Sequence, residues 1–416
     1  MNTFNMQEMA QQAKIASRQA AQLTTTEKNQ LLGEMADAIE QDMAFIIAEN
    51  EKDLAAGRDK GLSAAMLDRL ALNEARIKDI AAAIREIISL ADPVGGIANM
   101  SMRPNGIQVG KMRIPLGVIA MIYEARPNVT AEAAALCLKA GNGVILRGGS
   151  EAIHSNLALA NCLHRVLEAH KLNPYVISVI PDTSRSVIES LLAQSESIDL
   201  VIPRGGEGLI RYVTENSQIP VIQHFKGVCH LYIDEFADLE KAVNLLVNGK
   251  TQKPSACNAI ETVLIHQDIA KQFLPMADKA LSEFNVKIHA CELSQSLLSD
   301  AMLATEDDYH AEYLAQEIAV KVVSDYDQAI DHINTYTSDH TEVIVTQDTS
   351  RAQQFVRQIN SSVVMVNASS RFSDGNQLGL GSEIGISTSK LHAYGPMGLE
   401  ALTTEKFVVY GDGQTR

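Results

Sequence analysis

Residues 117–152 read GVIAMIYEARPNVTAEAAALCLKAGNGVILRGGSEA and contain one complete strand–helix–strand unit. VIAMI (118–122) has no polar residue, which is typical of a strand covered on both faces of its sheet. A helical segment follows over residues 130–139, and GVILR (143–147) is the next strand. Two strands joined by a helix run in the same direction, so this stretch predicts a parallel α/β sheet.

The same alternation continues along most of the chain, after about ninety residues with helical periodicity. In the first series a helix near 154–170 is followed by three strand-like runs: VISVI (176–180), DLVIP (199–203) and VI (221–222). A second series begins near Gly227 and contains six such runs: HLYID, ETVLI, VKI, AVKVV, EVIVT and SVVMV. We therefore expect two α/β lobes, each built on a mainly parallel sheet.

Two segments belong to neither series. SMRPNGIQVGKMRI (101–114) predicts a β-hairpin with Asn105-Gly106 at its turn. TTEKFVVYG (403–411) is a single strand near the C-terminus with no evident partner in either lobe. Because exposed strand edges need cover, these segments favour pairing between copies of the chain.

Composition and charge exclude several classes of protein. The 416 residues carry 51 acidic and 35 basic side chains, a formal charge of −16 that disfavours nucleic acid and anionic lipid as partners. The N-terminus lacks the apolar core of a signal peptide, and no apolar run is long enough to span a bilayer, so a soluble cytoplasmic protein is expected. The five cysteines form no CxxC pair and no His/Cys cluster at zinc spacing, so the sequence predicts free thiols and no metal site.

One of the five cysteines differs from the rest. Three lie in apolar segments, where a small buried side chain is expected: Cys137, Cys162 and Cys229. Cys291 is a loop thiol without supporting context. Cys257 lies in QKPSACNAIETVLIH (252–266), where small and polar neighbours leave its sulfur accessible. A cation such as Lys250 or Lys253, or a helix N-terminus, would lower the pKa of such a thiol, so Cys257 is the candidate nucleophile.

Two glycine-rich turns are candidate nucleotide-binding loops. The chain contains neither a GxGxxG fingerprint at a first strand–helix turn nor a Walker A sequence. Gly148-Gly149-Ser150-Glu151 and Arg204-Gly205-Gly206-Glu207-Gly208 each follow a strand and precede a helix, where backbone amides attract anions. Arg147 and Arg204 could add charge for an extra phosphate. An anion site and a tight turn without a ligand remain equal alternatives here.

Residues 117–152 resemble the aldehyde dehydrogenase superfamily, in which a Pro–Asn pair precedes a helix, a strand and a phosphate-facing turn. Five further segments narrow the resemblance to the γ-glutamyl phosphate-reducing branch of that superfamily: DLVIPRGGEGLI, FKGVCHLYID, KPSACNAIETVLIH, VNASSRFSDG and KLHAYGPMGLEALTTEKF. The similarity covers essentially the whole chain, in order.

The resemblance implies a fold of two parallel-sheet α/β lobes with a β-hairpin oligomerisation arm. It assigns residues 1–100 and 115–226 to a cofactor-binding domain, 227–400 to a catalytic domain, and 101–114 with 401–416 to the arm. It also implies NADPH-dependent reduction of L-glutamyl 5-phosphate to L-glutamate 5-semialdehyde with phosphate release, a step of proline biosynthesis. A homo-oligomer is expected, either dimer or tetramer, together with a separate glutamate 5-kinase that could contact it.

Carried over by position, the resemblance makes Cys257 the nucleophile and Asn128 an oxyanion donor beside the Cys257 amide. Hydrolytic members use a glutamate near His224–His230, where this sequence has none, as suits a reductase that must preserve its thioester.

The same resemblance places the cofactor at the turns of 147–151 and 204–206, through Arg147, Gly149, Ser150, Glu151, Arg204, Gly205 and Gly206. Glu317 is either a contact of the nicotinamide ribose or a solvated helix-end glutamate. Lys226 serves the substrate phosphate or solvates its loop, and Arg371 binds the substrate α-carboxylate or forms a structural salt bridge. Tyr394 stands where the family suggests arginine, which leaves any anion contact there in doubt.

Two rival interpretations remain. An acylating dehydrogenase that passes its thioester to coenzyme A would also lack the hydrolytic glutamate. A catalytically silent oligomeric protein would keep only the fold, but it has no reason to retain both Cys257 and Asn128. The sequence determines neither the preference for NADP over NAD nor the number of subunits.

Overall fold

The computed structural model describes residues 4–416, which form two compact units. Unit 1 runs to Gln223 and also includes Leu380–Gly385 and Met397–Arg416. Unit 2 consists of His224–Gly379 and Ile386–Pro396. The chain thus enters unit 2 slightly before the expected residue 227, and it returns to unit 1 first at residue 380 rather than near 401.

Five helices occupy the N-terminal part of unit 1: α1 (Met6–Ala20), α2 (Thr25–Gln41), α3 (Met43–Asp59), α4 (Ala64–Leu70) and α5 (Glu74–Ser89). A capping box begins α2, because the Thr24 hydroxyl accepts from the Glu27 amide while the Glu27 carboxylate accepts from the Thr24 amide. The periodic isoleucines of α5 are all buried: Ile77, Ile80, Ile84 and Ile87.

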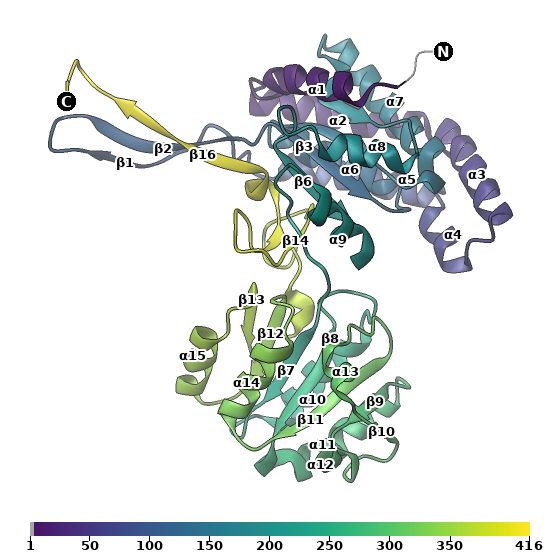
Figure 1. Ribbon diagram of the computed structural model, residues 1–416, viewed down its shortest axis with the longest axis vertical. Helices are drawn as coiled ribbons and strands as arrows, with labels where there is room; N and C mark the ends of the chain where they lie inside the picture. The colour runs from purple at the N-terminus through teal and green to yellow at the C-terminus, as the bar shows by residue number, and fades with distance from the viewer. Residues whose placement is uncertain (1–3) are drawn as a thin grey trace. The chain divides into compact units, whose positions relative to one another are not determined.

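A parallel sheet with the order β5-β4-β3-β6 forms the centre of unit 1. Its strands alternate with helices along the chain: β3 (Val118–Tyr123), α6 (Asn128–Lys139), β4 (Gly143–Arg147), α7 (Ile153–Ala169), β5 (Ile177–Val179), α8 (Arg185–Leu192), β6 (Leu200–Arg204) and α9 (Glu207–Asn216). Every residue of β3 is buried, because helices cover both faces of the sheet (Figure 1). The predicted parallel sheet is confirmed for this unit.

The expected strand at 221–222 is wrong. Val221 forms only an isolated bridge with Val201, next to β6. Pro220 precedes it and has no amide to donate, so the ladder cannot extend in that direction.

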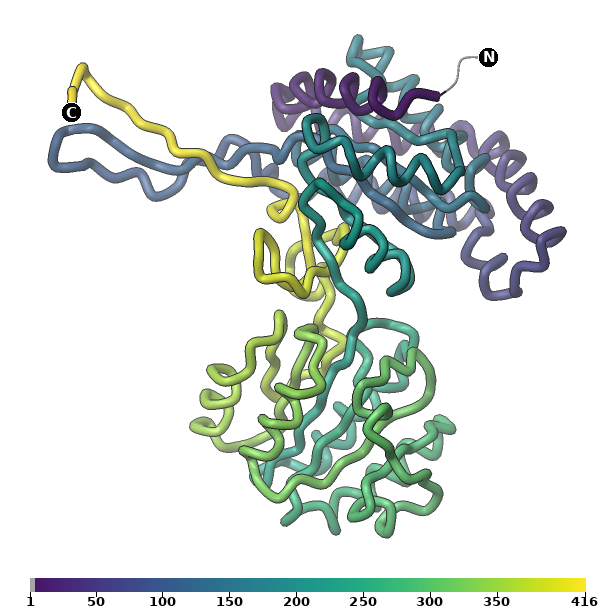
Figure 2. The backbone as a smooth tube through the Cα atoms, viewed as in Figure 1, coloured from purple at the N-terminus to yellow at the C-terminus, as the bar shows by residue number. Residues whose placement is uncertain are grey.

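A three-stranded antiparallel sheet also belongs to unit 1 and is called the arm below. It consists of β1 (Ile97–Met102), β2 (Gln108–Pro115) and β16 (Thr403–Tyr410), in the order β1-β2-β16. Gly106, at φ +89°, takes the left-handed conformation that the hairpin turn needs. The C-terminal strand pairs with β2 along all 8 of its residues, as Figure 2 shows for the yellow segment beside the blue hairpin.

Unit 2 is built on a seven-stranded parallel sheet with the order β10-β9-β11-β8-β7-β12-β13. Its strands are β7 (Cys229–Ile233), β8 (Ile260–His266), β9 (Lys287–Ala290), β10 (Ala301–Leu303), β11 (Glu317–Val323), β12 (Thr341–Val345) and β13 (Val363–Val366). The six expected strands are present, and β10 is an additional short one at the edge.

Helices cover both faces of this sheet as well: α10 (Leu239–Thr251), α11 (Gln267–Ser282), α12 (Glu292–Gln295), α13 (Glu306–His310), α14 (Tyr326–Tyr336) and α15 (Thr349–Gln358). On β8, Val263 and Ile265 pack in the core against α10 and α11, whereas Leu264 packs in the core against α14 and α15. Each such side chain stabilises the fold by about 1.5–3 kcal/mol. With both faces covered, only the strand ends remain for chemistry.

Shorter elements complete the described chain: 3-10 turns at Ser150–Ala152, Pro174–Val176, Ser370–Phe372 and Leu399–Leu402, and the paired strands β14 (Gly385–Ser387) and β15 (Gly395–Met397). None of the helices in residues 4–416 combines the length and apolarity that a bilayer crossing demands.

Candidate active site

Cys257 lies in a double turn between the end of α10 and the start of β8. The Ala256 amide donates to the Lys253 carbonyl at 3.1 Å, and the Ala259 amide donates to the Ala256 carbonyl at 2.9 Å. Cys257 is half-buried, whereas Cys137, Cys162 and Cys229 are fully buried, as the sequence predicts. The thiol is therefore held at the amino end of a central strand, partly open to solvent.

The backbone of Cys257 is tightly enclosed. A Cβ atom added to Gly227 would lie 2.0 Å from the Cys257 carbonyl oxygen, so only glycine lets the two chain segments approach. The Cys229 thiol donates to the same carbonyl at 3.3 Å. On the other side, the Asn258 side-chain amide donates to the Ser373 carbonyl at 2.8 Å. These contacts position the candidate nucleophile.

Hydrogen bonds hold the segment around Gly227, which packs against the backbone of Cys257. The Gly227 amide donates to Glu312 Oε1 at 2.8 Å, and the Val228 amide donates to Ser338 Oγ at 2.7 Å. Lys226 Nζ donates to the His310 carbonyl at 2.7 Å, which uses one of its three N–H groups. Binding of the substrate phosphate by Lys226 remains a prediction.

The structure brings two histidines to Cys257 that the sequence did not single out. One ring nitrogen each of His224 and His340 and the Cys257 sulfur all lie within 4.8 Å of one another. The two rings meet edge to face, with centroids 5.4 Å apart. Burial lowers the pKa of His340 to about 3, and the neighbouring His224 adds to this shift. No sequence spacing reveals this cluster, because its members come from three separate loops.

Lys250 does not serve the thiol as the sequence suggested. Its ammonium is fully buried and lies 2.6 Å from the equally buried Glu261 carboxylate. Burial raises the pKa of Glu261 to about 7 and lowers that of Lys250, and the attraction between the two groups opposes both shifts. The helix that precedes Cys257, α10, ends before it and so does not offer the thiol its N-terminus. The charge on Lys250 is thus committed to Glu261.

Arg371 lies beside the loop that carries Cys257. Its Nε donates to Gln252 Oε1 at 2.6 Å, and Nη1 is buried without a hydrogen-bond partner among residues 4–416. An unsatisfied guanidinium nitrogen near the nucleophile is consistent with a carboxylate ligand. Tyr394, in place of the expected arginine, donates its hydroxyl to the Asn360 carbonyl at 2.6 Å and so secures the segment before β13.

Glu317 is the first residue of β11, so its description as a helix-end glutamate is wrong. Its carboxylate pairs with Lys287 Nζ at 2.7 Å on the neighbouring strand β9. Glu317 pairs with Lys287 at the amino end of the sheet, the same end from which Cys257 enters β8. The contact with a nicotinamide ribose remains a prediction.

The cofactor residues predicted in unit 1 meet at the carboxyl ends of its strands. Arg147 ends β4 opposite Ile122, and Arg204 ends β6 opposite Tyr123. With β3 between them, the two backbones are roughly 10 Å apart. Arg147 Nη2 donates to the Thr183 carbonyl, whereas its buried Nε has no hydrogen-bond partner within residues 4–416.

The turn after β4 is closely packed. A Cβ on Gly148 would lie 2.2 Å from Asn156 Nδ2, and one on Gly149 would lie 2.4 Å from Glu151 Oε1. The Ser150 hydroxyl donates to Glu151 Oε2 at 3.3 Å. One 3-10 turn separates this loop from α7, which begins at Ile153, close to the expected start near residue 154. Bare backbone at a strand–helix turn is the geometry that accepts a phosphate.

The turn after β6 is partly occupied. The Gly206 amide donates to Glu124 Oε2 at 3.3 Å, and a Cβ on Gly205 would lie 2.8 Å from the Glu124 carboxyl carbon. A phosphate here would meet a carboxylate, as it also would at the turn after β4, where the Glu151 carboxylate lies against Gly149.

Asn128 is the first residue of α6. Its Nδ2 donates to Glu132 Oε1 at 3.0 Å, and burial raises the pKa of that carboxyl group. Asn128 belongs to unit 1 and Cys257 to unit 2, so the proposed oxyanion contact remains a prediction.

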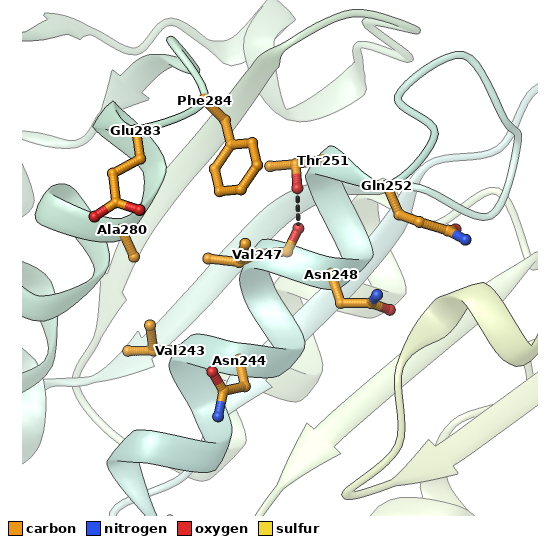
Figure 3. Close-up of a pocket in the computed structure, with 9 residues that line it drawn as sticks. All are labelled: Val243, Asn244, Val247, Asn248, Thr251, Gln252, Ala280, Glu283 and Phe284. Carbon is orange, nitrogen blue, oxygen red and sulfur yellow. Dashed lines mark hydrogen bonds between the residues drawn. The ribbon is translucent and has the colours of Figure 1, made fainter.

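A separate hollow lies between α10 and α11 (Figure 3). Its lining consists of Val243, Asn244, Val247, Asn248, Thr251, Gln252, Ala280, Glu283 and Phe284. Glu283 is the only ionisable side chain in the lining, which contains no cysteine, histidine or lysine. We assign no chemistry to this hollow.

Comparison with known proteins identifies the class first. The sequence model of the aldehyde dehydrogenase family matches residues 2–295. The chain belongs to the aldehyde dehydrogenase family. It accordingly uses a nicotinamide cofactor. The carboxyl edge of the parallel sheet in unit 1 fits such a cofactor, because Arg147 Nε has no hydrogen-bond partner among the described residues and Gly148 and Gly149 present backbone without side chains.

Three similar proteins share one name within that family. The gamma-glutamyl phosphate reductase of Colwellia psychrerythraea is 74% identical, covering 100% of both sequences. That of Salinibacter ruber is 57% identical, covering 98% of this chain and 94% of its own. The crystal structure of gamma-glutamyl phosphate reductase from Thermotoga maritima, 42% identical, matches with a TM-score of 0.98 over 99% of this chain and 100% of the other.

Proposed function

We propose that this chain reduces L-glutamyl 5-phosphate with NADPH to L-glutamate 5-semialdehyde and phosphate, a step of proline biosynthesis. The observation that carries this proposal is the position of Cys257, half-buried in a clamped loop at the amino end of a buried strand. The shared name of three relatives that match nearly the whole chain supports the substrate.

The acyl phosphate calls for a nucleophile rather than a strong acid. Cys257 Sγ attacks the γ-carbonyl carbon, the bond from that carbon to the phosphate oxygen breaks, and a thioester forms on the cysteine. A free thiol is only a few per cent ionised near pH 7, so the site must favour the thiolate. Phosphate leaves with its electron pair and needs little protonation.

The tetrahedral species that precede and follow the thioester carry an oxyanion. We assign its stabilisation to the Cys257 amide and the Asn128 side-chain amide. The nicotinamide, when bound, supplies the hydride that reduces the thioester carbonyl. The carbon–sulfur bond then breaks, which releases the aldehyde and restores the Cys257 thiol.

Most of the residues that hold the cofactor in this proposal belong to unit 1. Gly149, Ser150 and Glu151 form the phosphate-facing turn, Arg147 selects the additional phosphate of NADPH, and Glu317 contacts the ribose. Arg204, Gly205 and Gly206 form the neighbouring edge. The unpaired nitrogen of Arg147 supports its assignment most directly.

Substrate recognition is assigned to two cations of unit 2. Arg371 binds the α-carboxylate, which its unpaired Nη1 supports. Lys226 binds the departing phosphate with the N–H groups not used by His310. No glutamate is present in residues 224–230, which favours reduction over hydrolysis of the thioester.

The arm is proposed to join two copies of the chain. Every residue of β1 is exposed, and apolar side chains such as Met102 (67% exposed) and Phe407 (71% exposed) face solvent. A strand edge with apolar side chains favours pairing with an identical strand. We also propose that the enzyme works in the cytoplasm, supplied by a separate glutamate 5-kinase, because its acyl phosphate substrate cyclises readily.

The reverse reaction tests the chemistry, because the forward substrate is too labile to store. Purified protein is incubated with glutamate semialdehyde, NADP⁺ and either phosphate, coenzyme A or neither, and NADPH absorbance is followed. We expect absorbance only with phosphate, and none from Cys257→Ala. Cys291→Ala is the matched control, because this thiol is also half-buried but lies outside the site.

Each other outcome has a definite meaning. Absorbance that requires coenzyme A would replace the proposal by an acylating dehydrogenase. Absorbance without any acceptor would indicate hydrolysis. Full activity in Cys257→Ala would remove the nucleophile from the proposal.

A further inference from the structure

Three loops of unit 2 bring two imidazoles and a thiol to one point. His224 precedes β7, Cys257 precedes β8, and His340 precedes β12. These strands are neighbours in the order β8-β7-β12, about 4.8 Å apart, so the loops at their amino ends are adjacent. The Cys257 sulfur and one ring nitrogen of each histidine lie within 4.8 Å of one another.

Hydrogen bonds determine which nitrogen of His340 is available. The Thr341 hydroxyl donates to Ser373 Oγ at 2.8 Å, so it must accept from His340 Nδ1, which is also 2.8 Å away. The Cys229 thiol, which donates elsewhere, offers a second acceptor 3.7 Å from Nδ1. The proton is therefore on Nδ1, and Nε2 carries a lone pair.

That lone pair is buried and unsatisfied. His340 is 0% exposed, and Nε2 has no hydrogen-bond partner within the described residues. Metal-binding histidines have this arrangement, in which one ring N–H is held by an oxygen and the other nitrogen is left for the ion. Thr341 would be the outer partner that orients the ring.

The donor set selects the ion. Two imidazoles and one thiolate suit Zn²⁺, whereas Mg²⁺ and Ca²⁺ require oxygen donors. In a tetrahedral zinc site with Zn–S near 2.3 Å and Zn–N near 2.0 Å, the ligand atoms are roughly 3.5 Å apart. Separations of up to 4.8 Å therefore need to contract by about 1 Å, within reach of side-chain rotation at the half-buried His224 and Cys257.

We propose that His224, Cys257 and His340 form a Zn²⁺ site, with the fourth position open to water. Binding forms a Zn–S bond and releases the thiol proton to solvent. Because the ion occupies the sulfur that must attack substrate, zinc reversibly inhibits the enzyme. The inhibition rests on the proposed role of Cys257, whereas binding of the ion does not.

Cobalt is the spectroscopic probe for this site. The metal-free full chain is titrated with Co²⁺, and the charge-transfer absorption of a cobalt–thiolate bond and the visible bands of tetrahedral Co²⁺ are recorded. We expect both, saturating at one ion per chain, lost in Cys257→Ala and kept in Cys291→Ala. Zn²⁺ should displace the cobalt and erase the absorption.

Substitutions at the histidines test the ligand assignment. His224→Gln and His340→Gln should each weaken binding by more than the roughly 10–100-fold that the loss of an outer partner costs, and Thr341→Val by about that amount. Asp268→Asn is the control. It alters the other candidate group, Glu235, His266 and Asp268, in which Glu235 is already paired with Arg351 at 3.2 Å.

Activity measurements complete the test. Zinc should inhibit the wild type, and a chelator should restore full activity. Because His340 is buried, circular dichroism checks that its variant folds, and His224→Gln gives an independent test at a half-buried position.

The proposal fails if cobalt shows no thiolate absorption, or if that absorption persists in a folded His224→Gln or His340→Gln variant. If the absorption is lost in Cys257→Ala while turnover is not, the metal site stands and the proposed nucleophile falls. If turnover is lost in Cys257→Ala but wild-type protein binds no cobalt, the nucleophile stands and the metal site falls.

Discussion

The candidate site residues lie at opposite ends of the parallel strands in the two α/β units. In unit 1 the candidate residues include the last residues of two strands, Arg147 and Arg204. In unit 2 they precede the strands, at Cys257 before β8 and His340 before β12. The usual binding edge of open α/β sheets is the carboxyl one, so unit 1 obeys the rule and unit 2 departs from it.

The difference has a physical basis in the helices. After each strand of the parallel sheet in unit 1 a helix begins, and its free amides suit an anion such as a phosphate. The loop of Cys257 instead follows the C-terminal end of α10, which offers carbonyl groups. The dipole of α10 therefore does not favour the thiolate of Cys257.

The buried groups near the two edges differ as well. Unit 1 carries a neutral chain there, with the Tyr123 hydroxyl 2.6 Å from Thr130 Oγ1, which donates to Asn156. Unit 2 carries the ion pair of Lys250 and Glu261. Substitution of these buried groups should therefore destabilise unit 2 more than unit 1.

The largest effect is expected from Lys250→Met. It leaves Glu261 buried without its partner and should destabilise unit 2 by about 3–5 kcal/mol. The double variant Lys250→Met/Glu261→Leu should recover most of that loss. Hydrogen exchange of the β8 amides in urea measures the free energy of unfolding of unit 2. A decrease below about 1 kcal/mol in Lys250→Met would show that the ion pair does not stabilise this unit.

Gly227→Ala should lower kcat by displacing Cys257 at the amino edge of the unit 2 sheet. The new Cβ would lie 2.0 Å from the Cys257 carbonyl and shift the nucleophile. A displacement of about 1 Å lowers kcat by roughly 100-fold, while the KM for NADPH stays unchanged. Gly33→Ala is the control, because its Cβ meets only an ordinary contact at 3.9 Å. An unchanged kcat would mean that the clamp does not position Cys257.

The pH dependence of stability should be steeper for unit 2. Burial holds the pKa of His332 at about 2, well below its ordinary value near 6.5, with lesser contributions from His230, Lys321 and His310. The unfolded chain therefore binds a proton below pH 6.5 that the folded chain does not, so stability is lost as pH falls from 6.5 toward 2. This one group contributes up to about 1.4 kcal/mol per pH unit.

His332→Gln should remove that part of the slope. Urea unfolding at pH 7, 6 and 5 measures it, followed by a signal from unit 2. Identical slopes in wild type and His332→Gln would show that the ring does not stay neutral.

The smallest effect is expected at the carboxyl edge of unit 1. Arg147→Gln should raise the KM for NADPH by about fivefold, or roughly 1 kcal/mol, because a partly exposed charge contributes little. The kcat and the KM for NADH should change by less than a factor of about two. Equal effects on both coenzymes would place the additional phosphate elsewhere.

The sequence by itself determined the order of strands and helices, because burial on two faces leaves an uninterrupted apolar run in each strand. It also singled out Cys257 and the turn at Gly149, since both signals depend on immediate neighbours. It failed at residues 221–222, where two apolar residues after Pro220 make one bridge rather than a strand.

Only the tertiary structure decided which of these residues meet. The order β8-β7-β12 brings His224, Cys257 and His340 together, and the packing of α10 on β8 commits Lys250 to Glu261. The pairing of β16 with β2 likewise places the C-terminal strand beside residues 108–115, which are distant in the sequence. A local sequence pattern reflects only interactions with nearby residues in the chain. The order of strands in the sheet determines which side chains from distant parts of the sequence lie close together.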